Sequence, residues 1–256
     1  MKRSSNTKRA LRHAGVLVSC AMLTPLAEAQ TLPPPIEDSP IRSYFLFDQF
    51  EHTTARFAGG SKGSDALRFN TLGWIGGDYN RLWIYTEGTK PYNGRMEDLD
   101  VQVLYGRLVA PFWDLQAGVR YFKPRSDGPS RTYAVFGVQG LAPYRFGVQA
   151  AAFVSERGEV SGRAEVEYEL LLTQRWILQP RFATNIAVQE VRELGIGRGV
   201  NDVEFGLRLR YEIKREFAPY IGVSWQKRFG GAAKFARERG EDVSGWRVVA
   251  GVRVWF

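Results

Sequence analysis

The chain has 256 residues, with 35 Lys and Arg against 27 Asp and Glu, and its net charge is +8 at pH 7. Five of the basic residues lie within the first twelve positions, so much of the basic balance belongs to the N-terminus and argues against a nucleic-acid partner. The one cysteine, Cys20, lies in the same N-terminal region, which excludes disulfides, thiolate metal sites and cysteine catalysis from the remainder.

The N-terminus has the three parts of a secretory signal peptide. A basic start is followed by an apolar run at 14–23 and an A-x-A sequence at 27–29, which predicts a signal peptide over 1–29. The string LVSC at 17–20 also resembles a lipoprotein processing site, and this alternative stays open. Removal of the leader takes away five basic residues and one acidic residue, so the net charge falls from +8 to +4.

Residues 30–41 (QTLPPPIEDSPI) are rich in proline and polar residues, and they predict a flexible periplasmic lead-in. From Arg42 onward apolar and polar residues alternate with the period of two that marks a β-strand. We find no helical period, and no later apolar run is long enough for a transmembrane helix. Twelve strands are expected, near 42–51, 67–76, 79–88, 99–107, 113–122, 132–141, 146–155, 161–171, 175–187, 202–212, 219–229 and 245–256.

The last strand shows the alternation well. Every second residue from Trp246 to Phe256 is apolar, and the opposite face carries Arg247 and Arg253. A soluble β-sandwich would bury the apolar face, whereas a transmembrane barrel turns it to lipid and lets the arginines meet water in the lumen. A terminal strand that ends in Phe resembles the C-terminal signal of bacterial outer-membrane barrels.

The connections alternate between short turns and longer segments rich in Gly, Ser and charge, which is the pattern of outer-membrane barrels. We therefore predict an all-β, transmembrane up-and-down antiparallel β-barrel of about twelve strands over 42–256, with both termini in the periplasm. Aromatic residues near the strand ends favour interfacial girdles over a sandwich core. They are Trp74, Trp83, Trp113, Tyr121, Tyr144, Trp176, Tyr211, Tyr220, Trp225 and Trp255.

Charges of both signs lie on the polar faces of the expected strands. In a narrow lumen such groups must pair or stay hydrated, since an isolated buried charge is very costly. Two interpretations stay open: a salt-bridge network that fills and stiffens the barrel, or a polar path for a small ion. The candidates are Arg120, Arg163, Glu165, Glu167, Glu169, Arg181, Glu204, Arg208, Arg210 and Glu212.

Seven strings also resemble the copper resistance protein B family, and the resemblance covers nearly all of 43–256. It implies an outer-membrane barrel of Gram-negative bacteria that takes part in copper tolerance alongside a periplasmic multicopper oxidase and smaller copper carriers. The strings are FLFDQFE at 45–51, GWIGGDYNRLW at 73–83, WDLQAGVRY at 113–121, GLAPY at 140–144, LLLTQRWILQPR at 170–181, GLRLRYEIKREFAPYIGV at 206–223 and VAGVRVWF at 249–256.

The chain departs from the family in its supply of copper ligands. Many members carry an N-terminal segment rich in Met and His, the residues that copper prefers, but 31–41 has neither. His52 is the one histidine after the leader, and with Asp48 and Glu51 it could hold Cu(II) weakly. In a regular strand Asp48 and Glu51 would point to opposite faces, so solvated carboxylates and a histidine at a loop base are the alternative.

The resulting expectation is an outer-membrane protein that contacts lipid, supports copper binding and sequestration or copper efflux, and has a periplasmic oxidase or copper carrier as its partner. The alternative is a general pore or a structural barrel that binds no copper directly. We expect no enzyme, because a Ser–His hydrolase needs a base beside its nucleophile and His52 lies outside any G-x-S-x-G pattern.

Overall fold

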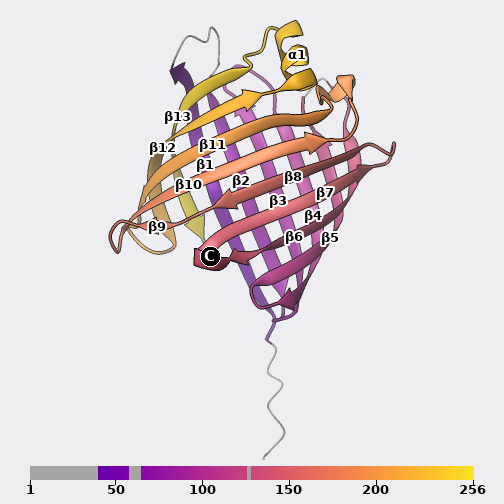
Figure 1. The fold of residues 1–256 in the computed structure, drawn as a ribbon. Helices are drawn as coiled ribbons and strands as arrows, with labels where there is room; N and C mark the ends of the chain where they lie inside the picture. The colour runs from indigo at the N-terminus through magenta and orange to yellow at the C-terminus, as the bar shows by residue number, and fades with distance from the viewer. Residues whose placement is uncertain (1–39, 58–64, 126–127) are drawn as a thin grey trace, which may run out of the picture. The chain divides into compact units, whose positions relative to one another are not determined.

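The computed structural model describes residues 40–57, 65–125 and 128–256, which form a closed antiparallel β-barrel (Figure 1). Strands that follow one another in the chain are neighbours in the barrel wall, and the pairing of β13 with β1 closes the wall. The predicted signal peptide and nearly all of the predicted lead-in lie outside the described residues.

The strands fall close to the segments expected from the sequence. They are β1 (Arg42–Phe57), β2 (Ala66–Gly76), β3 (Asn80–Pro91), β4 (Glu97–Ala110), β5 (Trp113–Lys123), β6 (Arg131–Ala142), β7 (Phe146–Ser155), β8 (Val160–Glu167), β9 (Leu170–Leu171), β10 (Trp176–Ala187), β11 (Gly199–Tyr211), β12 (Phe217–Arg228) and β13 (Ser244–Trp255). The short helices are η1 (Pro143–Arg145), η2 (Arg192–Leu194) and α1 (Gly230–Glu238).

Strands β8 and β9 are two parts of one interrupted strand. Both pair with β10, and between them the backbone N–H of Tyr168 still donates to the carbonyl of Pro180 at 3.1 Å. The described residues therefore form a barrel of twelve strands, which confirms the predicted fold class.

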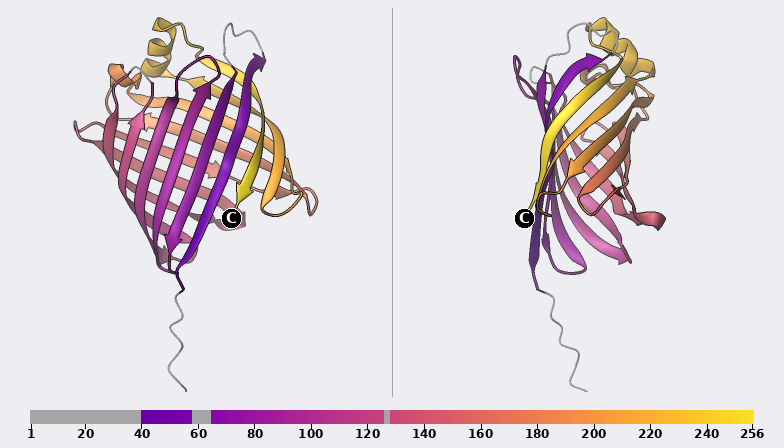
Figure 2. Two further views of the ribbon diagram at one scale, coloured as in Figure 1. Left: turned by 180° about the vertical axis from the view of Figure 1, so that it is seen from behind. Right: turned by 90° about the vertical axis from the view of Figure 1, so that its left-hand side faces the viewer.

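The two ends of the barrel differ in their connections (Figure 2). Short turns join β2 to β3, β4 to β5, β6 to β7 and β11 to β12 at one end, and α1 lies among the connections at the other end. The last residue lies at the short-turn end, where the backbones of Phe45 and Phe256 exchange two hydrogen bonds of 2.9 and 3.0 Å. The predicted alternation of short and long connections is thus present.

The strands present an apolar face to the outside and a more polar face to the lumen. On β5, Leu115 and Val119 are exposed, whereas Gln116 and Arg120 are buried inside. An exposed apolar band around a closed wall is what a lipid-facing barrel requires. Within the part of the chain that the structure describes, no helix has the length and apolar character needed to cross a bilayer.

The prediction of aromatic girdles is wrong for Trp83 and Tyr220, and also for Trp74, which packs against the apolar cluster in the lumen. Trp83 and Tyr220 are 4% and 5% exposed and lie inside the barrel, because each falls on the strand face that points to the lumen. Tyr121, Tyr144 and Trp176 are exposed, as expected of girdle residues.

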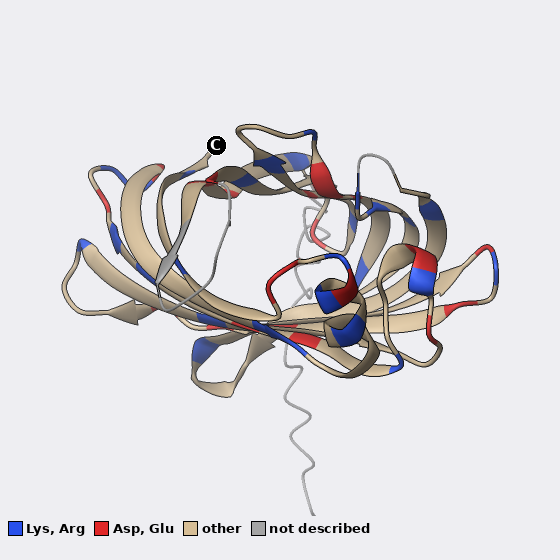
Figure 3. Cartoon of the chain, turned by 90° about the horizontal axis from the view of Figure 1, so that it is seen from above, with Lys and Arg blue, Asp and Glu red and all other residues tan. Residues whose placement is uncertain are grey.

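The barrel is flattened when viewed along its axis, so that two broad walls face each other (Figure 3). Part of the space between them holds an apolar cluster of buried side chains, against which Leu72 and Trp74 also pack. Burial of this surface stabilises the barrel by about 25 cal/mol per Å² removed from water. The cluster consists of Trp83, Leu104, Tyr133, Val135 and Phe153.

Helix α1 corrects the expectation that the chain has no helix. It lies in the connection between β12 and β13, and buries Ala232, Ala233, Phe235 and Ala236 along one side. A close approach at Gly231 permits this packing: a Cβ there would lie 2.9 Å from the Cα of Gly197. With nine residues, of which the first two are glycines, the segment is too short to show a helical period in the sequence.

Glu241, just after α1, anchors this connection to the barrel. Its carboxylate accepts hydrogen bonds from Arg228 at 2.5 Å and Arg239 at 2.7 Å, and it lies 3.8 Å from Arg125 in the connection between β5 and β6. Burial by itself would raise the pKa of Glu241, but the hydrogen bonds from Arg239 and Arg228, with their charges, lower the pKa below its ordinary value.

The close approach of strands β4 and β5 gives a first prediction. A Cβ on Gly118 would collide with the backbone carbonyl of Val103 and lie 2.8 Å from the Cα of Leu104. Gly118→Ala should therefore lower the free energy of unfolding by about 1–3 kcal/mol. The same substitution at Gly245, where a Cβ would meet nothing within 4 Å, is the matched control. Equal stability of the two variants in guanidinium unfolding would contradict the close approach.

The anchor at Glu241 predicts a pH dependence. Because the folded state lowers the pKa of this carboxyl, its stabilising effect is fully present above the unfolded pKa and is lost as the pH falls through the folded pKa. A nitroxide at Lys234→Cys on α1 should become more mobile in acid, as measured by electron paramagnetic resonance. Addition of Glu241→Gln should give the mobile spectrum at neutral pH and remove the acid transition; an unchanged profile would exclude the anchor.

Candidate functional site in the barrel lumen

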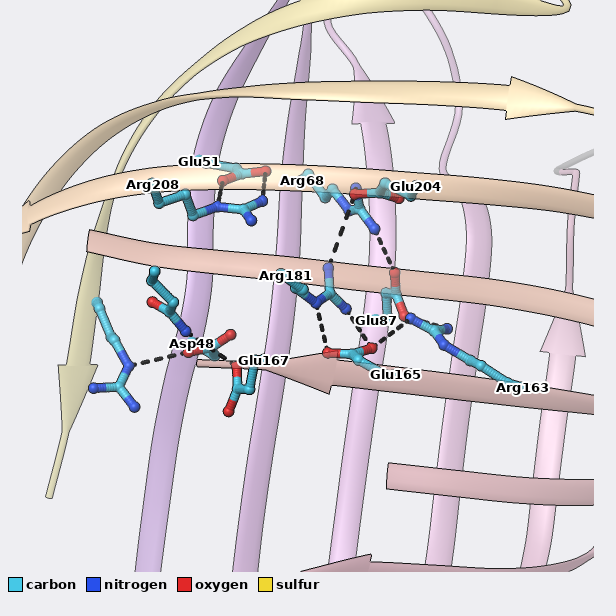
Figure 4. Close-up of polar contacts among 12 residues, drawn as sticks. Asp48, Glu51, Arg68, Glu87, Arg163, Glu165, Glu167, Arg181, Glu204 and Arg208 are labelled. Atoms are coloured by element: carbon cyan, nitrogen blue, oxygen red, sulfur yellow. Dashed lines mark hydrogen bonds and ion pairs between the residues drawn. The ribbon is translucent and has the colours of Figure 1, made fainter. Parts of the chain in front are cut away.

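Six side chains form a closed ring of alternating charge in the lumen, and we call them the lumen ring (Figure 4). Its shortest N···O distances are 2.9 Å for Arg68–Glu87 and for Arg68–Glu204, 2.8 Å for Arg163–Glu87, 3.4 Å for Arg163–Glu165, 2.5 Å for Arg181–Glu165 and 3.9 Å for Arg181–Glu204. Three guanidinium groups therefore face three carboxylates, and the ring carries no net charge.

Two of these pairs join strands that are not neighbours. Arg68 lies on β2 and Glu204 on β11, with β12, β13 and β1 between them in the wall. Glu87 lies on β3 and Arg163 on β8, with four strands between them. The lumen ring therefore ties the two broad walls of the flattened barrel together across the lumen.

A second ionic contact lies beside the ring. The Glu51 carboxylate is 1% exposed and accepts two hydrogen bonds of 3.0 Å from Arg208. The Tyr220 hydroxyl donates a third hydrogen bond to it at 3.0 Å. Paired guanidinium hydrogen bonds of this kind are among the strong ones in proteins, and this contact links β1 to β11 across β12 and β13.

A β-bulge in β1 overturns the expectation that Asp48 and Glu51 point to opposite faces. In the pairing with β2, Phe47 lies opposite Thr71 and Gln49 opposite Asn70, so Asp48 is an extra residue. The bulge shifts the inward and outward alternation of the β1 side chains by one residue. As a result, Asp48 also reaches the lumen, where it accepts a 3.0 Å hydrogen bond from Nε of Arg253 on β13.

The structure does not bring His52, Asp48 and Glu51 together. His52 follows Glu51 and points to the opposite face, where its Nδ1 lies 3.0 Å from the hydroxyl of Tyr92. The two carboxylates are held by Arg253 and Arg208. Among the described residues, no group of three or more His, Cys, Asp or Glu side chains could hold a metal ion. The donors present therefore do not fit a copper site in the described barrel.

The other predicted lumen charges also have partners. Arg120 pairs with Asp100 at 2.7 Å, and its guanidinium lies 4.1 Å from the ring centre of Phe153. Arg210 bridges Glu169 at 2.9 Å and Glu212 at 3.5 Å. Glu167 accepts a 3.1 Å hydrogen bond from the amide of Gln179.

Two members of the lumen ring, Arg68 and Glu87, were not among the predicted lumen charges. Glu87 could have been found, because Arg81, Trp83 and Tyr85 alternate with apolar residues on the same strand. Arg68 had no such signal, since β2 carries apolar residues on both faces. Besides their contact with each other, Arg68 pairs with Glu204 and Glu87 pairs with Arg163, on strands far away in the chain. No local pattern indicates these distant partners.

The fold and the lumen define a closed antiparallel barrel of the outer-membrane type. Among solved structures, this chain is similar to the NanC porin, with a TM-score of 0.51 at 13% sequence identity over 83% of this chain and 99% of that chain. At this level of identity the similarity establishes the fold alone.

The sequence comparisons identify the family. The model of the family "Copper resistance protein B precursor (CopB)" matches residues 41–256. The chain is also 44% identical over 222 residues to a copper resistance protein B homolog of Pseudomonas syringae pv. tomato and to copper resistance protein B of Escherichia coli, covering 86% of this chain and 72% of each relative. The chain belongs to the copper resistance protein B family, as the resemblance predicted.

The buried contact at Glu51 gives a testable prediction. Glu51→Ala leaves the Arg208 guanidinium unpaired in the lumen, so the free energy of unfolding should fall by about 3–5 kcal/mol. Glu238→Ala removes the partner of Arg192 in an exposed pair and should cost less than about 1 kcal/mol. Denaturant unfolding of the two variants in detergent measures the difference. Similar losses in both would show that the Glu51 contact contributes little.

Proposed function

We propose that this chain is an outer-membrane β-barrel that supports copper tolerance of the bacterial cell envelope. The observation that carries the proposal is the family membership of residues 41–256, together with the 44% identity to two copper resistance proteins B. The closed twelve-stranded wall with an apolar outer face supports the membrane location. The role is accessory and involves no chemical turnover.

The proposed orientation follows from the two ends of the barrel. Outer-membrane barrels place short turns in the periplasm and longer loops outside. The short-turn end, with Phe256, would then face the periplasm, and α1 would face the exterior. A periplasmic multicopper oxidase or copper carrier, as the proposed partner, would meet the short turns.

Direct copper binding and sequestration by the barrel would be a more specific form of this role. The described barrel gives little support for it. The one described histidine contacts Tyr92, and the nearby carboxylates are paired with arginines. This favours the second candidate function, a structural barrel that supports tolerance or efflux without a copper site of its own in the wall or lumen.

The copper role is tested by genetic complementation. In a Gram-negative strain that lacks its own copper resistance protein B, expression of this chain should raise the copper concentration that stops growth, with the protein in the outer-membrane fraction. Growth in zinc is the control and should not change. Correct location with unchanged copper tolerance would contradict the proposal.

Direct binding is tested by titration of the purified protein with Cu(I) and Cu(II), with His52→Ala as the comparison. Because the described donors are occupied by other side chains, we expect no binding at micromolar copper and no difference between the two proteins. Tight binding that His52→Ala abolishes would make His52 a ligand and the copper role direct.

A further inference from the structure

A water-accessible vestibule opens at the α1 end of the barrel and reaches down to the lumen ring. Its volume is about 860 Å³, and its walls include side chains from most of the strands and from the connections around α1. Arg68, Glu87, Arg163 and Glu204 line it. The same four residues make the two ion pairs that join the broad walls across the lumen. They form the floor of the vestibule.

A second, much smaller space of about 50 Å³ lies on the other side of the lumen ring. It shares Glu87, Arg163, Asp100 and Phe153 with the vestibule, and it is also lined by Glu165 of the ring. Its remaining lining includes Asn70 and Tyr85, which lie nearer the short-turn end than Arg68 and Glu87 on the same strands. Glu87 and Arg163 of the lumen ring, with Asp100 and Phe153 beside them, therefore lie between the two spaces along the barrel axis.

The cross-section beside the ring is filled by other side chains. The apolar cluster around Phe153 and Leu104 occupies the space between β3 and β7. Toward the short-turn end, the amide of Gln116 donates to the Tyr85 hydroxyl at 2.8 Å, and that hydroxyl donates to Gln139. These side chains narrow the lumen beside the ring in this half of the barrel.

We propose that the lumen ring is the permeation barrier of the barrel. With its ion pairs formed, the lumen conducts no hydrated ions; when Arg68–Glu204 and Glu87–Arg163 part, the vestibule joins the smaller space and opens a path for small ions. The copper role is not needed for this inference, which rests on the geometry of the ring. Alternating charges suit such a barrier, because each guanidinium is held by two carboxylates and none is left to attract an ion.

Conductance across planar lipid bilayers tests the proposal with three variants of the purified protein. The unaltered protein should show no single-channel current steps. Glu87→Ala with Glu204→Ala leaves three ring arginines against one glutamate, and should conduct with a preference for anions. Arg68→Ala with Arg163→Ala leaves one arginine against three glutamates, and should conduct with a preference for cations. In a KCl gradient the two reversal potentials should have opposite signs.

The third variant removes all four residues and leaves the Arg181–Glu165 pair, so no unpaired ring charge opposes folding. It should conduct with little preference between K⁺ and Cl⁻. Asp48→Asn is the matched control: it breaks a lumen ion pair between the neighbouring strands β1 and β13, and it should stay closed. Folding of each variant is checked by its heat-modifiable migration in gels. Conductance of the unaltered protein, or a silent but folded four-residue variant, would overturn the proposal.

Discussion

The ion pairs that cross the lumen are the contacts on which the arrangement of this barrel depends. Strand pairing alone specifies a closed wall, but it does not decide whether the wall is round or flattened. Arg68–Glu204 and Glu87–Arg163 join strands that the wall itself keeps apart. Charges removed from bulk water are tolerated only when they are paired and hydrogen-bonded, so these residues hold the two broad walls at the distance that their side chains can span.

The lumen is divided between two kinds of packing. The apolar cluster of Trp83, Leu104, Tyr133, Val135 and Phe153 fills one part in the manner of a soluble core, while the lumen ring and the Glu51–Arg208 contact fill another. Arg120 lies against the apolar part, where its guanidinium pairs with Asp100 and contacts the rings of Phe122 and Phe153. A lumen occupied in this way differs from a wide aqueous pore.

Family membership and ligand chemistry lead to different expectations for this chain. The family name refers to copper, yet the groups that copper prefers are scarce after residue 29: one histidine, His52, and one methionine, Met96. Carboxylates are abundant in the lumen, but the bonds they form with arginines compete directly with a cation. The donors in the described barrel therefore favour the second proposed function, a barrel without a copper site of its own.

Local patterns in the sequence were enough to predict the strand-rich class, the twelve strands and the inward position of charges such as Arg181 and Arg208, because these depend on a local period of two. The lengths of the connections predicted the short and long ends of the barrel. The pairing of these charges followed from the folded barrel and not from any local pattern. Glu87 and Arg163 are 76 residues apart in the chain, and their contact depends on barrel closure and flattening. The bulge at Asp48 lets both Asp48 and Glu51 point into the lumen, since one extra residue shifts every later side chain to the other face. Helix α1 depended on packing against Gly197, which no pattern within nine residues can reveal.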